Sequence, residues 1–162
     1  MAQRAEKEDP LRLDNQICFP LYACAKEIVR QYRRVLEPLK LTYTQYLVMM
    51  VLWEFGAMTE GELGKKLRLD SGTLAPLLKR LEKQGRIDRM RPAGNERRLL
   101  VQLTPKGEAL RQEALGIPEV VKECLQMPQE ELEQLRGLLD RALRSLETRQ
   151  TSPDAALICK PV

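Results

Sequence analysis

Apolar positions in the first third of the chain recur with the spacing of two helices. The first series predicts a helix that ends near Pro38, with Pro20 in its first turn, where a missing N–H costs little. Its members are Leu21, Ala25, Ile28, Tyr32, Val35 and Leu39. The second series, YLVMMVLWEF, is apolar on most sides and predicts a deeply buried helix from about Thr44 to Phe55, which Gly56 ends.

Polar residues mark the starts of the elements that follow. Thr59 and Glu62 fit a capping box, which predicts a short helix through Leu67. After the turn RLD, either Asp70 or Ser71 caps a further helix, SGTLAPLLKRLEKQG, which ends at its glycine. The period then changes, and the segments RIDRMRP and RRLLVQL predict two strands joined by a polar turn that contains Gly-Asn.

The last third of the chain predicts helices that are separated by prolines. Thr104 followed by Pro105 is the N-cap and first position of a helix that runs to about Leu115. The segment GIP interrupts it, EVVKECLQM predicts a further turn or two of helix, and Pro128 breaks the chain again. A last long helix carries a leucine stripe, made of Leu132, Leu135, Leu139, Leu143 and Leu146.

This order of elements predicts a mainly α fold with a small β-wing. Two helices joined by a short turn and followed by a hairpin form a winged helix-turn-helix, which we place at residues 43–104. The helices on either side, at residues 13–42 and 105–148, form a second, purely helical region. We expect residues 1–12 to be a mobile N-terminus and residues 149–162 to be a loose tail.

Positive charge is concentrated between Lys79 and Arg98. This segment carries eight cations and three anions, whereas the whole chain has a net charge of only +4. Such a segment can be a solvated face or the electrostatic footprint of a nucleic-acid partner. Because it coincides with the second helix of the helix-turn-helix and with the wing, we favour DNA binding.

The composition argues against several other classes of protein. The chain has no histidine and four cysteines, none of them spaced as a CxxC pair, so we expect no zinc site, no thioredoxin-like centre and no other cofactor. No run of about 18 apolar residues predicts a membrane span, and the start of the chain lacks the apolar core of a signal peptide. We therefore expect a cytoplasmic chain without a membrane partner, whose cysteines are free or redox-active.

Several strings of this sequence resemble a known family. LDSGTLAPLLKRLEKQGRIDRMR and NERRLLVQLTPKG are similar to the MarR family of transcriptional regulators. LDNQICFPLYACAKEIVRQY and LTYTQYLVMMVLWE resemble its organic hydroperoxide resistance regulator (OhrR) branch, of the two-cysteine type. The match covers about residues 11–147. One departure is Asn95, where the wing motif usually has an aspartate, so the charge that could pair with a wing arginine is missing.

The resemblance implies a homodimer that binds a pseudo-palindromic operator in double-stranded DNA, with the flanking helices as its dimerisation region. Small residues in the first half of the second helix of such a motif can approach base edges. Cations one turn later lie nearer phosphates, and arginines of the wing, Arg97 above all, suit a narrow minor groove. The candidate DNA-binding residues are Ser71, Thr73, Pro76, Lys79, Arg80, Arg91, Arg97 and Arg98.

Cys18 lies near the predicted start of the first helix and has two possible roles. Free cysteine is often buried, so Cys18 could be a small core residue. Alternatively, the N–H groups and dipole of a helix N-terminus favour the thiolate without histidine, and tyrosine hydroxyls can donate hydrogen bonds to it. The resemblance selects Tyr32 and Tyr43 as these donors. We expect Cys24 to pack as a small hydrophobic residue, and Cys159 to be an incidental thiol.

The position of Tyr32 adds a geometric constraint. It follows Cys18 by 14 residues on the same predicted helix, which is about 21 Å and too far for contact. If Tyr32 acts on this thiol, the site is shared between two subunits whose first helices are antiparallel, as the resemblance also implies. Phe19, Leu21 and Met50 could line a pocket for an alkyl or fatty hydroperoxide, although methionine at helical spacing is usually part of a core.

Three hypotheses for the function follow. The resemblance implies a redox-sensing repressor, in which an organic hydroperoxide oxidises Cys18 to a sulfenic acid that condenses with a second thiol. It places this thiol at Cys124, which we expect from the partner subunit, with Cys24 or an external thiol as rivals. The alternative is a MarR-type repressor released by a small phenolic ligand in the crevice of the dimer interface, with Cys18 incidental. A thiol peroxidase is not favoured, because neither a recycling partner nor a peroxidatic arginine or histidine is evident near Cys18, so we expect no enzyme.

Overall fold

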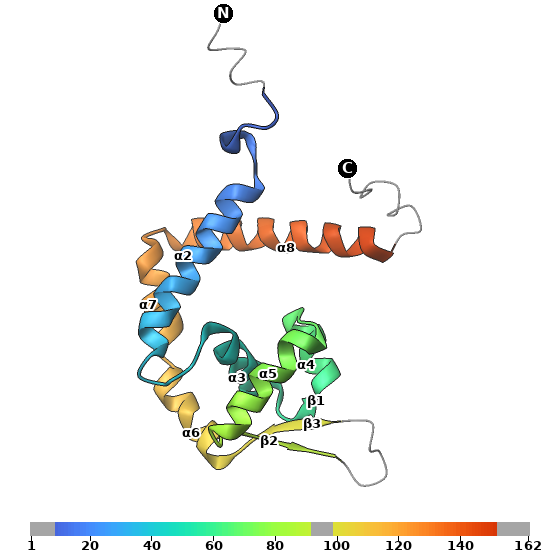
Figure 1. Cartoon of the computed structure of the whole chain (residues 1–162). Coiled ribbons are helices and arrows are strands. Elements are labelled where there is room, and N and C mark those ends of the chain that lie inside the picture. The colour runs from blue at the N-terminus through green and yellow to red at the C-terminus, as the bar shows by residue number, and fades with distance from the viewer. Residues whose placement is uncertain (1–8, 92–98, 152–162) are drawn as a thin grey trace, which may run out of the picture. The chain divides into compact units, whose positions relative to one another are not determined.

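The computed structural model describes residues 9–91 and 99–151 (Figure 1). Contacts divide the chain into two compact units, Met1–Val121 and Lys122–Val162, and each is described by itself. The first unit holds the winged helix and the helix that precedes it. The division falls inside the expected helical region 105–148, so the residues of that region belong to two different units.

The predicted elements appear in the predicted order, with the short η1 and β1 in addition, and the mainly α fold with a small β-wing is confirmed. Most of them belong to the first unit: η1 (Leu13–Asn15), α2 (Cys18–Leu36), α3 (Tyr43–Phe55), β1 (Met58–Thr59), α4 (Glu60–Leu67), α5 (Ser71–Lys83), β2 (Ile87–Met90), β3 (Leu100–Leu103) and α6 (Pro105–Ala114). Helix α7 (Ile117–Leu125) crosses the division, and α8 (Gln129–Thr151) lies in the second unit. Helix α8 therefore extends into the segment 149–162 that we expected to be loose, and the rest of that segment lies outside the described residues.

Side-chain caps fix where the helices begin. Thr59 accepts a hydrogen bond from the Glu62 N–H, and the Glu62 carboxylate accepts one from the Thr59 N–H at 2.8 Å, so the predicted capping box is present. Thr104 accepts from the Gly107 N–H at 3.1 Å and starts α6, as predicted. Helix α3 has a second capping box, formed by Thr42 and Gln45. It was not predicted, although these two residues have the same spacing as Thr59 and Glu62.

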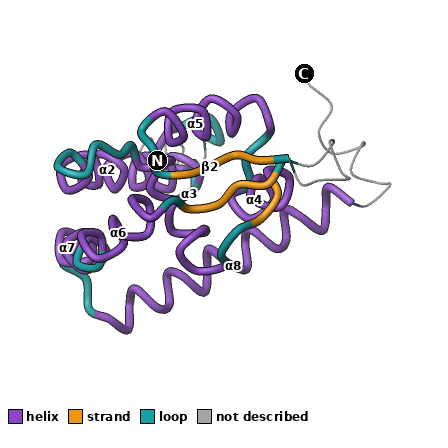
Figure 2. Tube along the Cα trace, turned by 90° about the horizontal axis from the view of Figure 1, so that it is seen from below, coloured by secondary structure: helices purple, strands orange, loops and turns teal. Residues whose placement is uncertain are grey.

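The sheet has three antiparallel strands in the order β1-β3-β2 (Figure 2). Ile87 pairs with Leu103 and Met90 with Leu100, which confirms the two predicted strands of the wing. Strand β1 pairs Met58 with Val101 and was not predicted, because two residues are too few to show an alternating pattern. The turn between β2 and β3, including Asn95, lies outside the described residues.

The core of the first unit is built by the winged helix. Its fully buried side chains come from the end of α2, from α3, α4 and α5, and from β2 and β3: Leu36, Tyr46, Val48, Met49, Leu52, Leu63, Leu74, Leu78, Leu81, Ile87 and Val101. Helix α3 is central, as predicted, but it is not enclosed on all sides, since Met50 and Phe55 are 40% and 51% exposed.

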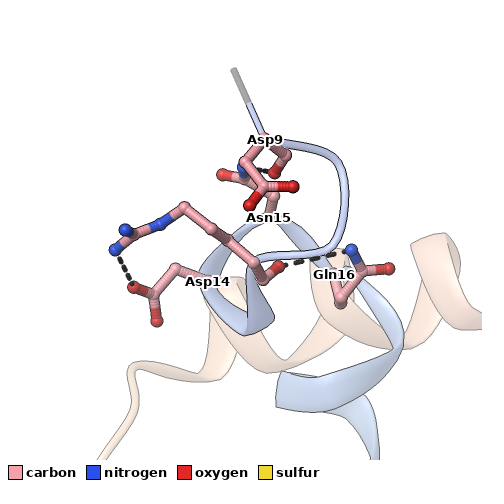
Figure 3. A network of polar contacts seen from close by, with 5 residues as sticks. Asp9, Asp14, Asn15 and Gln16 are labelled. Atoms are coloured by element: carbon pink, nitrogen blue, oxygen red, sulfur yellow. Dashed lines mark hydrogen bonds and ion pairs between the residues drawn. The ribbon is translucent and has the colours of Figure 1, made fainter. Parts of the chain in front are cut away.

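A hydrogen-bonded turn precedes α2 (Figure 3). The backbone oxygen of Asp9 accepts from the Asn15 side chain at 2.8 Å, and the backbone oxygen of Arg12 accepts from the Gln16 side chain at 3.3 Å. Arg12 also forms an ion pair with Asp14 at 3.4 Å. Residues 9–12 therefore take part in a hydrogen-bonded turn, whereas the mobility expected for residues 1–12 stays a prediction, and the first eight of these residues lie outside the described residues.

Candidate functional site

Helix α5 presents one buried face and one exposed face. Leu74, Leu78 and Leu81 are buried and anchor the helix to the core. The five residues predicted to face DNA are all exposed: Ser71, Thr73, Pro76, Lys79 and Arg80. With 3.6 residues per turn, the last four of these lie on the side opposite the buried leucines. The structure thus brings the predicted small and cationic residues of this helix onto one surface.

Asp70 is the N-cap of α5, which decides between the two predicted candidates. Its carboxylate accepts hydrogen bonds of 2.9 Å from both the backbone N–H and the hydroxyl of Thr73. These hydrogen bonds hold the pKa of Asp70 below its ordinary value. The Thr73 hydroxyl is therefore already engaged, and its methyl group is the part that remains for contact with a base.

Two of the cations between Lys79 and Arg98 are directed into the protein and not toward solvent. Arg86 is only 7% exposed, and its guanidinium donates to the backbone oxygens of Leu39 and Lys40. Arg89 is half-buried and forms ion pairs with Glu60 of α4 at 3.5 Å and with Glu82 of α5 at 3.6 Å. The positive charge available to DNA is therefore smaller than the sequence count suggested.

The remaining candidates of the wing are described only in part. Arg91 follows β2 and is exposed, as expected for a residue that contacts DNA. Arg97 and Arg98 lie outside the described residues, so their assignment remains a prediction.

Cys18 is the first residue of α2 and is exposed. This position agrees with a thiol at a helix N-terminus and disagrees with a small core residue. The surroundings offer fewer free donors than expected, because the Phe19 N–H donates to the Gln16 backbone oxygen at 3.1 Å and Pro20 has no N–H. The N-cap, Ile17, provides no side-chain hydrogen bond.

The other cysteines also differ from expectation. Cys24 is exposed, so the prediction that it packs as a small hydrophobic residue is wrong for the single chain. Most residues of α2 are exposed in the single chain, which periodicity alone does not reveal. Cys124, in α7, is an exposed free thiol. Cys159 lies outside the described residues.

Tyr32 and Tyr43 lie together at the ends of two consecutive helices. Their ring centroids are 4.6 Å apart, and the ring of Tyr46 is 5.9 Å from that of Tyr32. Burial, with smaller contributions from Tyr43 and Tyr46, raises the pKa of Tyr32 to about 12. Burial also raises the pKa of Tyr43. The hydroxyl groups therefore keep their protons at neutral pH and can act as hydrogen-bond donors.

Tyr46 also belongs to this cluster and was not predicted there, although its spacing of one helical turn from Tyr43 was a usable signal.

The structure does not bring Cys18 and Tyr32 together within one chain. They are at opposite ends of the unbroken helix α2, which separates them by about 21 Å.

The predicted pocket of Phe19, Leu21 and Met50 is not formed within the chain. Phe19 and Leu21 are 42% and 44% exposed. Met50 instead lines a different cavity of about 260 Å³ between α3, α6 and the start of α7. The other residues around this cavity are Tyr46, Trp53, Glu54, Arg111, Ala114, Leu115 and Pro118.

Two other kinds of site are absent from residues 9–91 and 99–151. No cluster of three or more cysteine, aspartate or glutamate side chains there could hold a metal ion. In the same residues, no helix is long and apolar enough to cross a membrane.

Comparisons with known proteins agree with this architecture. Residues 41–99 match the model of the MarR family. The chain is 41% identical over 143 residues to the organic hydroperoxide resistance transcriptional regulator of Bacillus subtilis, covering 88% of this chain and 97% of that protein.

Solved structures of AbfR, a protein of Staphylococcus epidermidis, are also similar. Reduced AbfR bound to DNA matches with a TM-score of 0.71 and 34% identity, over 88% of this chain and 99% of AbfR. Disulfide-formed AbfR matches with a TM-score of 0.59 at the same identity, over 86% of this chain and 98% of that chain. The winged-helix architecture and these similarities together show that the chain belongs to the MarR family of transcriptional regulators and is not an enzyme.

Proposed function

We propose that this protein is a homodimeric, redox-sensing repressor that releases its operator when an organic hydroperoxide oxidises Cys18. The observation that carries this proposal is the pairing of an exposed thiol at the start of α2 with a tyrosine cluster at its other end. The Cys18 thiol needs hydroxyl donors, and the tyrosine hydroxyls keep their protons. Within one chain, however, Cys18 and Tyr32 are about 21 Å apart. Two copies with antiparallel α2 helices bring each thiol to the tyrosines of the other copy.

Exposed apolar side chains support the dimer. Ile17, the N-cap of α2, and Leu21 and Val29 within the helix are all more than 40% exposed, and the one buried residue of α2 is Leu36. In α8, the exposed large residues are Leu138, Leu139, Leu143 and Leu146. Monomeric proteins rarely leave contiguous apolar stripes of this length in water, so a second copy is the natural cover.

The DNA-binding mode follows from α5. Its exposed face enters the major groove, with Ser71, Thr73 and Pro76 toward base edges and two cations, Lys79 and Arg80, toward phosphates. The Arg91, Arg97 and Arg98 side chains of the wing approach the minor groove. A two-fold symmetric dimer then requires a pseudo-palindromic operator. That AbfR has been solved on DNA supports this mode for a relative.

Release of the operator involves two chemical steps, oxidation of Cys18 and formation of a disulfide. The Cys18 thiolate attacks the outer oxygen of the hydroperoxide, the O–O bond breaks, and the products are a sulfenic acid and an alcohol, whose oxygen takes up a proton. The thiol of Cys124 of the partner subunit then attacks the Cys18 sulfur, which forms a disulfide and releases water. Both cysteines are exposed, as this requires. Cys24 and an external thiol are the rival partners.

The proposal is tested with a duplex selected by the reduced protein from random sequence. Cumene hydroperoxide should release this duplex from the wild type, and a non-reducing gel should then show a covalent dimer. Cys18→Ser should bind nearly as well but resist release. Cys124→Ser should stop at a sulfenic acid and migrate as a monomer. Release of Cys18→Ser at the wild-type rate would reduce Cys18 to a packing residue.

The cavity around Met50 supports a second candidate function, a repressor released by a small phenolic ligand. Trp53 and Tyr46 offer aromatic walls, and Arg111 and Glu54 offer polar groups at the rim. Salicylate as a probe should then lower operator affinity in Cys18→Ser as much as in the wild type, and Arg111→Met should weaken this response. No effect of salicylate on either protein would contradict this candidate.

A further inference from the structure

Arg86 makes an unusual long-range connection. It lies just before β2, yet its buried guanidinium donates to the backbone oxygens of Leu39 and Lys40, which belong to the turn between α2 and α3. The Gln84 side chain donates to the same Lys40 oxygen at 3.4 Å. Burial lowers the pKa of Arg86, while nearby Glu113 opposes this change, and a guanidinium stays charged throughout the neutral range.

The turn that Arg86 holds is itself fixed to both helices. Leu39 and Leu41 are each only 6% exposed, and the Leu41 N–H donates to the Leu36 oxygen at 3.3 Å. Lys40 has a φ of 51°, in the left-handed region that few residues adopt. The next residue, Thr42, is the N-cap of α3. Residues 37–42 are therefore held firmly to the ends of α2 and α3.

The backbone around Arg86 is tied to the DNA-binding elements. Its N–H donates to the Leu81 oxygen of α5 at 3.0 Å, and its carbonyl oxygen accepts from the Thr104 N–H at 3.1 Å. The Lys106 ammonium donates to the Gln84 oxygen at 2.9 Å. A Cβ atom at Gly107 would overlap the Arg86 carbonyl oxygen, so α6 approaches as closely as glycine permits.

We propose that Arg86 is the positioning residue that transmits movement of the turn 37–42 to the recognition helix α5 and the first wing strand β2. One side of this connection holds the helices that carry Cys18, Tyr32 and Tyr43. The other side holds the surface predicted to bind DNA. This inference rests on the proposed redox function for its biological meaning, because oxidation of Cys18 is the event that would move α2.

The main test compares operator affinity before and after oxidation. We would measure the operator Kd of the reduced and the oxidised dimer by fluorescence anisotropy for wild type, Arg86→Met, Arg86→Lys and the exposed control Arg141→Met. In Arg86→Met the ratio of oxidised to reduced Kd should fall by at least about fivefold. Arg86→Lys should be intermediate, because an ammonium group can reach one of the two carbonyl oxygens. Arg141→Met should keep the wild-type ratio.

Two measurements separate positioning from loss of structure. Thermal melting should stay cooperative, and a thiol titration should show that the Arg86→Met dimer is fully oxidised before its Kd is measured, because the ratio compares the two end states and not the rate of oxidation. A folded Arg86→Met protein with the wild-type Kd ratio overturns the inference. If Arg86→Met does not melt cooperatively, Gln84→Ala, which removes only the second donor to Lys40, should show a smaller but measurable fall, and no fall overturns the inference.

A second arm does not depend on oxidation. Binding at α5 should change the hydrogen exchange of backbone amides in residues 37–42, because coupling between two sites is reciprocal. With the reduced protein, the selected duplex should slow exchange at Leu41 in the wild type but not in Arg86→Met. An equal response in both proteins, or none in the wild type, overturns the inference. A wild type that shows the response but keeps its operator after oxidation overturns the proposed redox function alone.

Discussion

The winged helix and the helices that flank it differ in how they bury their apolar side chains. Leu63, Leu78 and Val101 of the winged helix are fully enclosed by their own chain. By contrast, Leu36 is the one buried residue of α2, and Leu146 of α8 is 60% exposed. The first region completes its core within one chain, whereas the second leaves large apolar side chains of α2 and α8 exposed. The proposed sensor belongs to this second, incomplete region.

Truncation of one leucine in each region should give the largest difference in the free energy of unfolding. Leu78→Ala should lower the free energy of unfolding by about 2–5 kcal/mol, because it leaves a cavity in a closed core. Leu146→Ala should cost about 0.5 kcal/mol or less in a separated subunit. Urea unfolding at several protein concentrations distinguishes the two. A Leu146→Ala loss that grows with concentration supports cover by a second copy, and a loss independent of concentration argues against it.

A pair of glycines gives the next largest difference. Gly107→Ala places a methyl group against the Arg86 carbonyl oxygen, and we expect a loss of about 1–3 kcal/mol from overpacking. Gly137→Ala, in α8, meets nothing within its own chain and should stabilise the helix by up to about 1 kcal/mol. Thermal melting measures both changes. Destabilisation by Gly137→Ala would mean that another chain packs closely against that position.

A third pair compares cations. Arg97→Ala, on the wing, should weaken operator binding about 5- to 100-fold, or about 1–3 kcal/mol. Arg141→Ala, on α8, removes the same charge from the flanking region and should leave affinity within about twofold. Fluorescence anisotropy at about 150 mM salt checks both. Equal affinities of wild type and Arg97→Ala would remove the wing from the proposed DNA-binding mode.

The smallest expected effect is a pH dependence at the start of α5. The pKa of Asp70 is lower in the folded protein than in the unfolded chain, so its contribution to stability is present at neutral pH and is lost as pH falls through the folded pKa. Asp70→Asn keeps a capping side chain but removes this titration. Urea unfolding at pH 7 and pH 3 should therefore show a smaller acid loss in Asp70→Asn. Equal acid losses would mean that the cap does not contribute through its charge.

The sequence was most informative where local chemistry decides the structure. The capping box of Thr59 and Glu62, the Asp70 cap and the Thr104–Pro105 start all depend on residues within one turn of each other. Strand β1 was missed because its two residues pair only with a distant strand. The burial of Arg86 depends on carbonyl oxygens of Leu39 and Lys40, and no periodic pattern reports such a contact.

The flanking region shows a different limit of sequence analysis. The stripe of α2 predicted a helix correctly, but it did not indicate that Cys24 would be exposed or that Phe19 and Leu21 would not meet Met50. In these cases the pattern gives the apolar face and leaves open which molecule covers it. The resemblance selected Tyr32 and Tyr43 as donors to the Cys18 thiol, a role that stays a prediction, and the distance of Tyr32 from Cys18 follows from helix geometry alone.

The most direct test of the shared sensor is a mixed dimer of Cys18→Ser and Tyr32→Phe subunits. The Tyr32→Phe homodimer should react slowly with cumene hydroperoxide, because each thiol has lost one hydroxyl donor. In the mixed dimer the one remaining Cys18 faces the intact tyrosine of the Cys18→Ser subunit. A sulfenic-acid-specific label should then show oxidation of this thiol at the wild-type rate. Oxidation as slow as in the Tyr32→Phe homodimer would contradict a site shared between subunits.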